Sequence, residues 1–262
     1  MEPTVFEWLR QRRRALNALV AREVLTRYGR HNIGFLWLVI EPALFAIAIA
    51  ALWSAIRGPT NPAMSVAGFA LTGYATVLLW RNAAGRCTTA VSTNWALLYH
   101  ACIDPVDLYL ARIVIELLSA TAGFAVIGAV MIALGYVQPV HDVVGLLCAW
   151  GAMMLFACGF ALFIGAIAHL SESFERMWHM IAYLLFPISG PAYMVEWLPD
   201  WAREWALWIP MVHGTEWIRG AWFGPSLSTH EDPAYLLGAS AVLIVIGLAL
   251  VRKRGRIIEV AA

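Results

Sequence analysis

The sequence is nearly free of lysine and has few charged residues of any kind. Of its 262 residues, 13% are charged and 61% are hydrophobic. Lys253, followed by Arg254, is the single lysine. A P-loop needs the lysine of its G-x-x-x-x-G-K-[ST] motif to reach the nucleotide phosphates, and Lys253 has no such surroundings. The chain is therefore not a Walker-type ATPase.

Cysteine is also scarce, and its spacing carries no metal-binding or redox pattern. The four cysteines form no C-x-x-C pair, which is the spacing typical of zinc sites and thiol redox centres. We predict no disulfide and no metal site. The cysteines are Cys87, Cys102, Cys148 and Cys158.

The low charge accompanies a mean hydropathy of +0.70, which is typical of an integral membrane protein. The first apolar run follows a long basic stretch, and no cleavage site of small residues is evident after a short apolar segment. We therefore expect no signal peptide and expect the first span to be retained. The arginines before that run are Arg10, Arg12, Arg13, Arg14, Arg22, Arg27 and Arg30.

Six segments are long and apolar enough to cross a bilayer, which takes about 20 residues. The predicted fold is an all-α membrane protein with six transmembrane helices within residues 35–251. The predicted spans are 35–56, 64–81, 107–135, 143–170, 178–195 and 234–251.

Arginine-rich segments flank the spans at both ends of the chain. The positive-inside rule therefore predicts that both termini are cytoplasmic, including the tail 252–262. The loops 82–106 and 171–177 are then cytoplasmic, and residues 196–233 form a long external segment.

The N-terminal region 1–34 is predicted to form an amphipathic helix on the inner leaflet. Its apolar residues recur at helical spacing and its arginines occupy the other face. Each arginine near an anionic surface adds about 1 kcal/mol of attraction. The apolar residues are Phe6, Leu9, Leu16, Leu19, Val20 and Val24.

The external segment is predicted to contain two short helices at the outer interface. Asp200 can cap the first, and Pro210 is expected to stop it. The second is expected from Thr215 and carries Trp217, Ile218 and Trp222. On the first helix, Trp201, Trp205 and Trp208 share one face.

Glu41 and Pro42 lie inside the first predicted span. A carboxylate facing lipid would be costly, so an intramembrane glutamate usually faces a protein interior or a substrate path. Pro42 removes one helical hydrogen bond and can bend the span beside Glu41. The pair therefore indicates a functional position, or a polar contact made for packing alone.

Several motifs resemble those of ABC-2 type permeases, specifically the exporters of capsular polysaccharide. The resemblance covers nearly the whole chain, and Glu41 favours capsule exporters over O-antigen and teichoic-acid permeases, which more often have asparagine before the proline. The first segment carries Arg22-Glu23, Arg27-Tyr28-Gly29-Arg30, Gly34-Phe35-Leu36-Trp37 and Glu41-Pro42. Later motifs are Asp104-Pro105-Val106-Asp107 with Ala111-Arg112 and Glu116, and Pro210-Met211-Val212-His213 with Glu216 and Arg219.

This resemblance implies a homodimer in a bacterial inner membrane, bound to two copies of an ATP-binding subunit. The dimer would move a lipid-linked polysaccharide outward, aided by a periplasmic copolymerase-type protein and an outer-membrane export protein. The chain itself would be no enzyme and would bind no cofactor, since ATP and Mg²⁺ would be held by the partner subunit. No nucleic acid is expected as a partner.

The resemblance also places the contact with the ATPase on the cytoplasmic loops. We expect a coupling helix over Thr89–Tyr99 and a smaller second contact between the fourth and fifth spans. The candidate coupling residues are Asn94, Trp95, Leu98, Tyr99, Asp104, Glu172 and Glu175.

The substrate makes two chemical demands. A phosphate-bearing headgroup favours arginine, whose planar fork binds phosphate oxygens in pairs. The candidates for the headgroup site are Arg22, Arg27, Arg30 and His31, although these charges could also serve topology alone.

A sliding glycan favours flat aromatic faces. Pro187, Gly190 and Pro191 must break the fifth span, which is tolerated where backbone is buried or lines a cavity. The candidate channel aromatics are Trp37, Tyr183, Phe186 and Tyr193, and the candidate external gate consists of Trp197, Trp201 and Trp205.

A secondary transporter is the alternative from another class. Such folds usually show internal repeats with paired broken helices, whereas only the fifth predicted span is broken here. Arg112 and Glu116, four residues apart, are interpreted as an ion pair rather than a proton relay.

Overall fold

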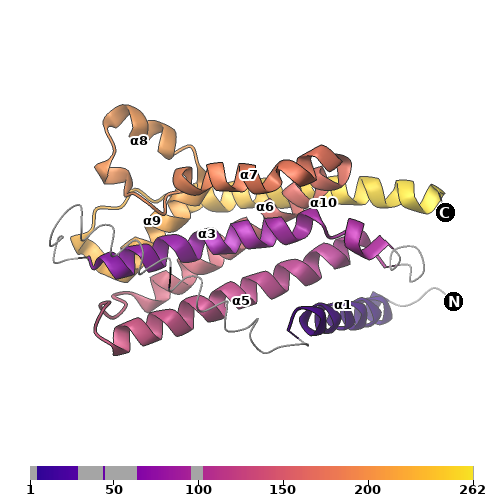
Figure 1. The fold of residues 1–262 in the computed structure, drawn as a ribbon, viewed down its shortest axis with the longest axis horizontal. Helices are drawn as coiled ribbons and strands as arrows, with labels where there is room; N and C mark the ends of the chain where they lie inside the picture. The colour runs from indigo at the N-terminus through magenta and orange to yellow at the C-terminus, as the bar shows by residue number, and fades with distance from the viewer. Residues whose placement is uncertain (1–4, 29–43, 45–63, 96–102, 262) are drawn as a thin grey trace.

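The computed structural model describes residues 5–28, 44, 64–95 and 103–261. Within these ranges the regular structure is entirely helical, with eight α-helices and three short 3-10 helices (Figure 1). The α-helices are α1 Val5–Tyr28, α3 Val66–Thr88, α5 Pro105–Ala133, α6 Val143–Leu170, α7 Glu172–Ile188, α8 Asp200–Ala206, α9 Pro210–Phe223 and α10 Pro233–Ala261. The 3-10 helices are η1 Ser92–Asn94, η2 Val195–Trp197 and η3 Gly224–Ser226.

Four of the long helices begin at a side chain that accepts a hydrogen bond from the first turn. Ser65 accepts from the Gly68 amide at 3.1 Å, and Asp142 accepts from the Gly145 amide at 2.9 Å. Such caps satisfy amide groups that have no partner inside the helix. Asp104 and Ser171 cap α5 and α7 in the same way.

Three helices within the described residues are long and apolar enough to cross a membrane. They are α5, α6 and the Pro233–Lys253 part of α10. Together with α3 and α7 they run along the long axis of the molecule (Figure 1). This confirms an all-helical protein with several membrane-length helices, while the count of six spans stays a prediction.

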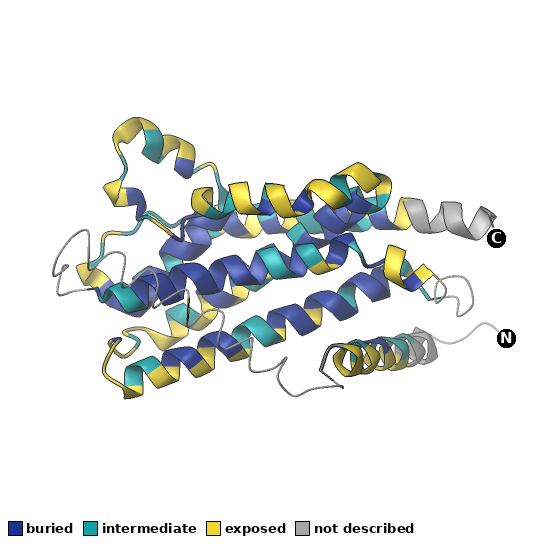
Figure 2. Cartoon of the chain, viewed as in Figure 1, coloured by how far each residue is buried: buried dark blue, intermediate teal, exposed yellow. Residues whose placement is uncertain are grey.

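Helix α3 lies at the centre of the bundle and packs against α5, α6 and α9. Most of its residues are buried, whereas α7 and α8 carry many exposed ones (Figure 2). Near the end of α3, helices α5 and α6 approach each other closely. There the Tyr109 hydroxyl of α5 donates to the Gly165 carbonyl of α6 at 3.1 Å. A Cβ at Gly165 would lie 2.5 Å from the Tyr109 ring and 2.8 Å from Cys87 Cβ, so only glycine fits there.

The two ends of the bundle differ in the elements they carry. Both chain termini lie at one end, together with α1 and the end of α3 (Figure 1). The opposite end carries α8, α9 and the turn between α5 and α6. We call these the terminal end and the gate end.

Several boundaries differ from the sequence predictions. Helix α3 continues to Thr88, so the first part of the predicted loop 82–106 is helical. A turn and η1 follow, in place of a helix starting at Thr89, and Leu98 and Tyr99 lie outside the described residues. Helix α7 begins at Glu172 rather than near 178, because Ser171 caps it. The predicted tail 252–262 continues α10 as far as Ala261.

The prediction for the second external helix was wrong in its start and its surroundings. Pro210 begins α9 instead of stopping the helix before it, as proline favours the first turn. Asp200 is the first residue of α8 and makes no side-chain cap. Helix α9 does not lie on the surface, because most of its side chains are buried; Ile218, for example, is 0% exposed.

Candidate functional site

The terminal end holds a polar network that joins α1, the end of α3 and α5. Helix α1 packs against α5, and Leu16, Leu19 and Val20 of its predicted apolar face lie in or against the hydrophobic core. Beside this contact, Arg12 Nε lies 3.0 Å from Asp107 Oδ1. Its Nη2 lies 3.4 Å from Asp104 Oδ2. Helix α1 is therefore fixed to the bundle by side-chain contacts.

Asp104 has two roles in this network. Its Oδ1 accepts a hydrogen bond from the Val106 amide at 2.9 Å and caps α5, while its Oδ2 pairs with Arg12. An acidic group at a helix N-terminus also interacts favourably with the helix dipole. The residue predicted to contact the ATPase thus also anchors α1.

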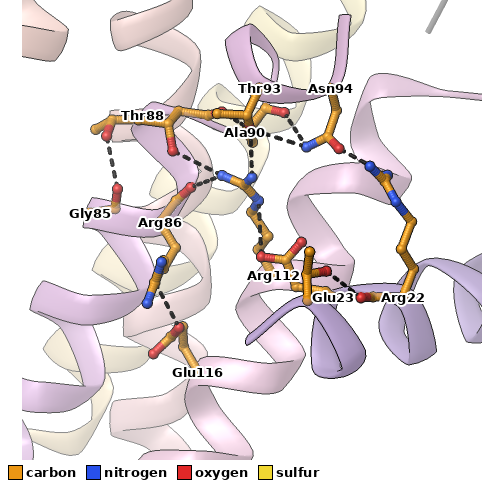
Figure 3. Close-up of polar contacts among 12 residues, drawn as sticks. Arg22, Glu23, Gly85, Arg86, Thr88, Ala90, Thr93, Asn94, Arg112 and Glu116 are labelled. Atoms are coloured by element: carbon orange, nitrogen blue, oxygen red, sulfur yellow. Dashed lines mark hydrogen bonds and ion pairs between the residues drawn. The ribbon is translucent and has the colours of Figure 1, made fainter. Parts of the chain in front are cut away.

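Arg22 and Asn94 meet although the sequence assigned them to different sites. Arg22 Nη1 donates to Asn94 Oδ1 at 3.0 Å (Figure 3). Asn94 in turn donates to the Ala90 carbonyl at 3.0 Å, which fixes the turn after α3. A candidate headgroup residue on α1 is therefore hydrogen-bonded to a candidate coupling residue.

Arg112 is the hub of the network and its side chain is only 10% exposed. It donates to the Arg86 carbonyl at 2.6 Å, to Thr89 Oγ1 at 3.0 Å and to Thr93 Oγ1 at 2.7 Å (Figure 3). Its Nε also lies 3.6 Å from Glu23 Oε1 on α1. One guanidinium therefore links three segments that are far apart in sequence.

Glu116 receives a cation from the neighbouring helix. Its Oε1 lies 3.3 Å from Arg86 Nε, and its side chain is 3% exposed (Figure 3). The structure thus gives Arg112 and Glu116 ionic partners on other elements, whereas the sequence suggested that they pair with each other. A paired carboxylate of this kind avoids the cost of an isolated buried charge.

The second contact predicted with the ATPase lies in the first turn of α7. Glu172 and Arg176 form an exposed pair at 3.3 Å, and Glu175 shares that turn. Trp95, after η1, is 51% exposed. These side chains are open to a partner at the terminal end.

A second site forms where α7 breaks. The helix contains Pro187 and ends at Ile188, and Gly190 follows with a φ of +93°, which favours glycine. The backbone carbonyls that follow the end of α7 accept hydrogen bonds from Arg219 of α9, which is 0% exposed. It donates to Gly190, Pro191 and Tyr193 carbonyls at 2.9, 2.7 and 2.6 Å.

Arg219 also lies 3.8 Å above the centre of the Phe69 ring on α3. This cation–π contact adds to the carbonyl bonds in offsetting the loss of solvation. Glu216, one turn earlier on α9, is also buried and accepts hydrogen bonds from the Val195 and His230 amides at 3.2 and 3.3 Å. Arg219 of α9 therefore holds the segment that follows α7, and Glu216 holds η2 and the segment before α10.

An exposed cluster lies beside this site. Glu196 Oε2 lies 2.6 Å from His230 Nε2 and 3.7 Å from Arg203. The hydrogen bond from His230, followed by the positive charge of Arg203, lowers the pKa of the Glu196 carboxyl. The cluster ties the segment before α8 to the segment before α10.

The predicted channel aromatics do not share one environment. Tyr183 is 70% exposed, whereas Phe186 is half-buried and contacts Tyr74 edge-to-face at 6.2 Å. Tyr193 is half-buried, and its hydroxyl donates to the Ile188 carbonyl at 2.7 Å. Among the described candidates, Tyr183 has the most open face.

The three gate tryptophans also separate into two groups. Trp197 lies against Phe69 with a ring separation of 5.3 Å. Trp201 and Trp205 are 73% and 72% exposed on α8, where Trp208 joins them at 74%.

Part of the candidate site lies outside the described residues. This applies to Arg30, His31, Trp37, Glu41, Leu98 and Tyr99, and Arg27 is described only as part of α1.

Sequence reasoning assigned no role to Arg219. Its position between tryptophans and small residues could have indicated a buried arginine. Among the described residues, no group of three His, Cys, Asp or Glu is placed to hold a metal ion.

Comparison with known proteins identifies the class of this chain. Residues 14–223 match the family described as ABC-2 type transporter. The chain therefore belongs to the ABC-2 type transporter family and is a membrane permease that pairs with a separate ATP-binding subunit. This confirms the resemblance read from the sequence and the prediction that the chain is a transporter component rather than an enzyme.

Individual relatives share nearly the full length. The capsule polysaccharide export inner-membrane protein CtrC of Neisseria meningitidis serogroup B is 41% identical over 97% of this chain and 96% of its own length. The capsule polysaccharide export inner-membrane protein BexB of Haemophilus influenzae is 37% identical over 94% of this chain and 93% of its own. The polysialic acid transport protein KpsM of Escherichia coli is 25% identical over 91% of this chain and 93% of its own.

Proposed function

We propose that this chain is the permease of an ATP-driven exporter that moves lipid-linked capsular polysaccharide across a bacterial inner membrane. The observation that supports this substrate is the similarity to the capsule export proteins CtrC and BexB over more than nine tenths of each chain. Membership of the ABC-2 family sets the secondary transporter aside.

The terminal end faces the cytoplasm in this proposal. Helix α1 and the C-terminal part of α10 lie towards that end (Figure 1). Both contain clusters of basic residues in the sequence, and cytoplasmic flanks of membrane spans are rich in such residues. The gate end then faces the periplasm. A homodimer with two ATP-binding subunits would place the exposed turns after α3 and before α7 against those subunits.

The polar network would carry force from the ATPase to α1. Asn94 lies on the proposed docking turn and is bonded to Arg22, while Arg112 bonds the same turn through Thr93 and reaches α1 through Glu23. A push on the turn would therefore move α1 and α5 together. Rigid, hydrogen-bonded elements with more than one arrangement are what transmits such coupling.

The lipid headgroup would bind on the exposed face of α1 and just after it. Arg22 is exposed and keeps donors beyond the one that Asn94 accepts. Arg27, Arg30 and His31 follow it in sequence, and Glu41 lies further along the proposed path. The headgroup site and the coupling turn would thus share Arg22.

The glycan would leave past the broken end of α7. Tyr183 offers an open aromatic face there, and Trp201 and Trp205 of α8 lie beyond it at the gate end. Flat rings contact sugars over a wide area without fixing one register, as a sliding polymer needs. We propose that periplasmic and outer-membrane proteins receive the glycan at this end.

The deciding experiment deletes the gene and measures surface and intracellular polysaccharide. Wild-type, Glu41→Gln and Arg27→Ala copies are returned separately at matched membrane levels. Trapped intracellular glycan in the deletion supports export, and reduced surface glycan in either variant assigns that residue to the path. Unchanged surface glycan in the deletion, with no second exporter present, would reject the function.

Orientation has its own test. A reporter fused after Asn94 is expected to be active as a cytoplasmic protein, and one fused after Pro225 as a periplasmic one. The opposite pattern would contradict the proposed orientation and the six-span topology with it.

A further inference from the structure

Helix α7 packs on one side only and leaves a wide exposed surface (Figure 2). Trp178 and Ala182 of its packed side are buried against the bundle. The exposed surface carries two stripes of different chemistry, and the members of each stripe are three or four residues apart, which aligns them along the helix. The apolar stripe consists of Met177, Met180, Leu184 and Ile188, and the polar stripe consists of Glu172, Arg176, His179 and Tyr183.

The polar stripe extends along the bundle, beside helices of membrane length (Figure 1). His179 and Tyr183 lie about 10 and 16 Å beyond the first residue of α7, at a rise of about 1.5 Å per residue, and both are exposed. Ionisable side chains at such depth in membrane proteins face a protein interior or a water-filled cavity. The apolar stripe suits lipid chains or a second copy of the protein, whereas the polar stripe suits an aqueous path.

The polar stripe borders the seam between α7 and α3. His179 and Phe186 are seven residues apart and therefore lie on one line of the helix. Phe186 contacts Tyr74 of α3 edge-to-face, with ring centres 6.2 Å apart. The Arg81 guanidinium lies 5.8 Å from the centre of the same Tyr74 ring, and its Nη2 lies 3.5 Å from the Tyr74 hydroxyl. Arg81 and His179 therefore approach one seam from two helices.

The two helices run in opposite directions along this seam. Phe186 contacts Tyr74, while Trp178, two turns earlier on α7, lies beside Gly85, later on α3. A Cβ at Gly85 would lie 3.5 Å from Trp178 Nε1. Arg81 falls between Tyr74 and Gly85 in the sequence, so it lies along the same length of the seam as the deeper half of the polar stripe.

Basic side chains, and no carboxylates, line this part of the seam. Helix α3 and residues 176–188 of α7, all within the described part of the chain, contain no aspartate or glutamate. Carboxylates from elsewhere pair with Arg86 and Arg176. A negatively charged group that enters beside Arg81 and His179 would therefore be attracted, whereas a positively charged one would be repelled.

We propose that His179 of α7 and Arg81 of α3 form a contact for negatively charged groups, carboxylate or phosphate, of the glycan as it passes. The proposal rests on the proposed export function and adds two contact residues to the path. Arginine binds such groups through paired donors, and histidine donates a hydrogen bond in either protonation state. One strong and one weaker donor suit a polymer that moves on, because conduction requires binding that is weak enough for release.

The first test measures water access and electrostatic potential at the stripe without any substrate. His179→Cys and Met180→Cys are made separately in full-length permease whose four native cysteines are replaced by alanine. Each protein, in phosphatidylcholine nanodiscs, is labelled with an anionic sulfonatoethyl or a cationic trimethylammonioethyl methanethiosulfonate. Each rate is divided by the rate of the same reagent with free cysteine.

We expect the thiol of His179→Cys to prefer the anionic reagent about tenfold, because a cleft lined by one sign of charge concentrates counter-ions. Adding Arg81→Gln should reduce this preference. Met180→Cys is the matched control, since Met180 is 70% exposed but lies on the apolar stripe, and it should react slowly with both reagents. No labelling of His179→Cys, or the same preference at both positions, overturns the inference.

Protection from labelling identifies the source of the negative charge. A hyaluronan hexasaccharide, which carries carboxylates and no lipid, should slow labelling of His179→Cys, and an uncharged chitin hexasaccharide should not. Phosphatidylglycerol added to the nanodisc should leave the rate unchanged. Slowing by phosphatidylglycerol alone would assign the contact to a lipid headgroup and overturn the glycan contact.

Export measures the charge requirement in the cell. His179→Lys, His179→Gln and His179→Asp copies are returned to the deletion strain at matched membrane levels. Surface glycan should fall in that order, with about fivefold less for aspartate than for lysine, because like charges in contact repel. Met180→Lys and Met180→Asp should not differ from each other.

Equal export by His179→Lys and His179→Asp, at equal melting temperatures, overturns the contact. This failure is distinct from failure of the proposed function. Export without the expected order of charge rejects the contact alone, whereas unchanged surface glycan in the deletion, with no second exporter present, rejects the export function.

Discussion

Arg112 Nε of α5 lies 3.6 Å from Glu23 Oε1 of α1, and the same guanidinium donates to Thr93 Oγ1 at 2.7 Å in the turn after α3. A single side chain thus joins α1, the bundle and the proposed ATPase-contact turn. Only the five donors and planar shape of arginine allow this many contacts in different directions.

Replacing Arg112 by lysine should uncouple these elements. Lysine can keep the charge beside Glu23 but cannot reach the Arg86 carbonyl and both threonines, so unfolding should become easier by about 2 kcal/mol. Chemical unfolding in mixed micelles measures this change. Arg176→Lys, in an exposed pair with Glu172, is the control and should cost less than about 0.5 kcal/mol. Equal effects of both substitutions would contradict the central role of Arg112 in the polar network.

Arg22 and Asn94 should be energetically coupled. In a double-mutant cycle with alanine at both positions, the two effects on the free energy of unfolding should deviate from additivity by about 0.5–1 kcal/mol, because each substitution removes the same hydrogen bond. Additive effects would show that the bond contributes nothing to stability. A headgroup role for Arg22 would then have to be tested by export alone.

Gly73 should tolerate no side chain. A Cβ there would lie 2.6 Å from Arg219 Nη2 and 2.7 Å from the Pro191 carbonyl oxygen, so Gly73→Ala must displace the buried arginine from the break in α7. We expect a loss of about 1–3 kcal/mol in stability, measured as a lower midpoint of unfolding.

Gly151→Ala is the matched control for this substitution. Gly151 is also helical, but a Cβ there has nothing within 4 Å. The same change should leave stability unchanged or raise it by up to about 1 kcal/mol, since alanine favours helix. Similar losses at both glycines would argue against the close approach of α3 to Arg219.

The Glu196 cluster should make stability depend on acid. Because the pKa of Glu196 is lowered in the folded protein, its contribution is complete above its usual value of 4.5 and is lost as pH falls through the folded value. Glu196→Gln should therefore melt at a lower temperature than wild type at neutral pH, and the difference should shrink below pH 4.5. A difference that does not vary with pH would contradict the assignment.

The sequence predicted best those features that depend on local periodicity. The span 143–170 coincides with α6 because a long apolar run is bounded by Asp142 and Ser171, which both cap helices. A break inside the fifth predicted span, 178–195, was predicted from Pro187, Gly190 and Pro191, and the structure ends α7 at Ile188. Glycine and proline act on the backbone conformation at their own positions, so their effect can be predicted from the sequence without knowing the fold.

The surroundings of α9 were not predictable in this way. Its tryptophans and isoleucine suggested an interfacial helix, yet Ile218 and Arg219 are fully buried. The same mixture of apolar and charged residues suits an interface or a core that supplies carbonyl partners to its arginine. Those carbonyls come from the broken end of α7, which no local pattern places beside α9.

The sequence by itself determined that this is a helical membrane protein without a P-loop, since hydropathy, span length and a missing motif are properties of composition and order. Tertiary structure alone decided which charges meet. Arg112 and Glu116 are four residues apart, but their ionic partners are Glu23 and Arg86 on other elements. Helix packing brings these groups within reach, and a buried charge is stabilised by whichever partner packing supplies.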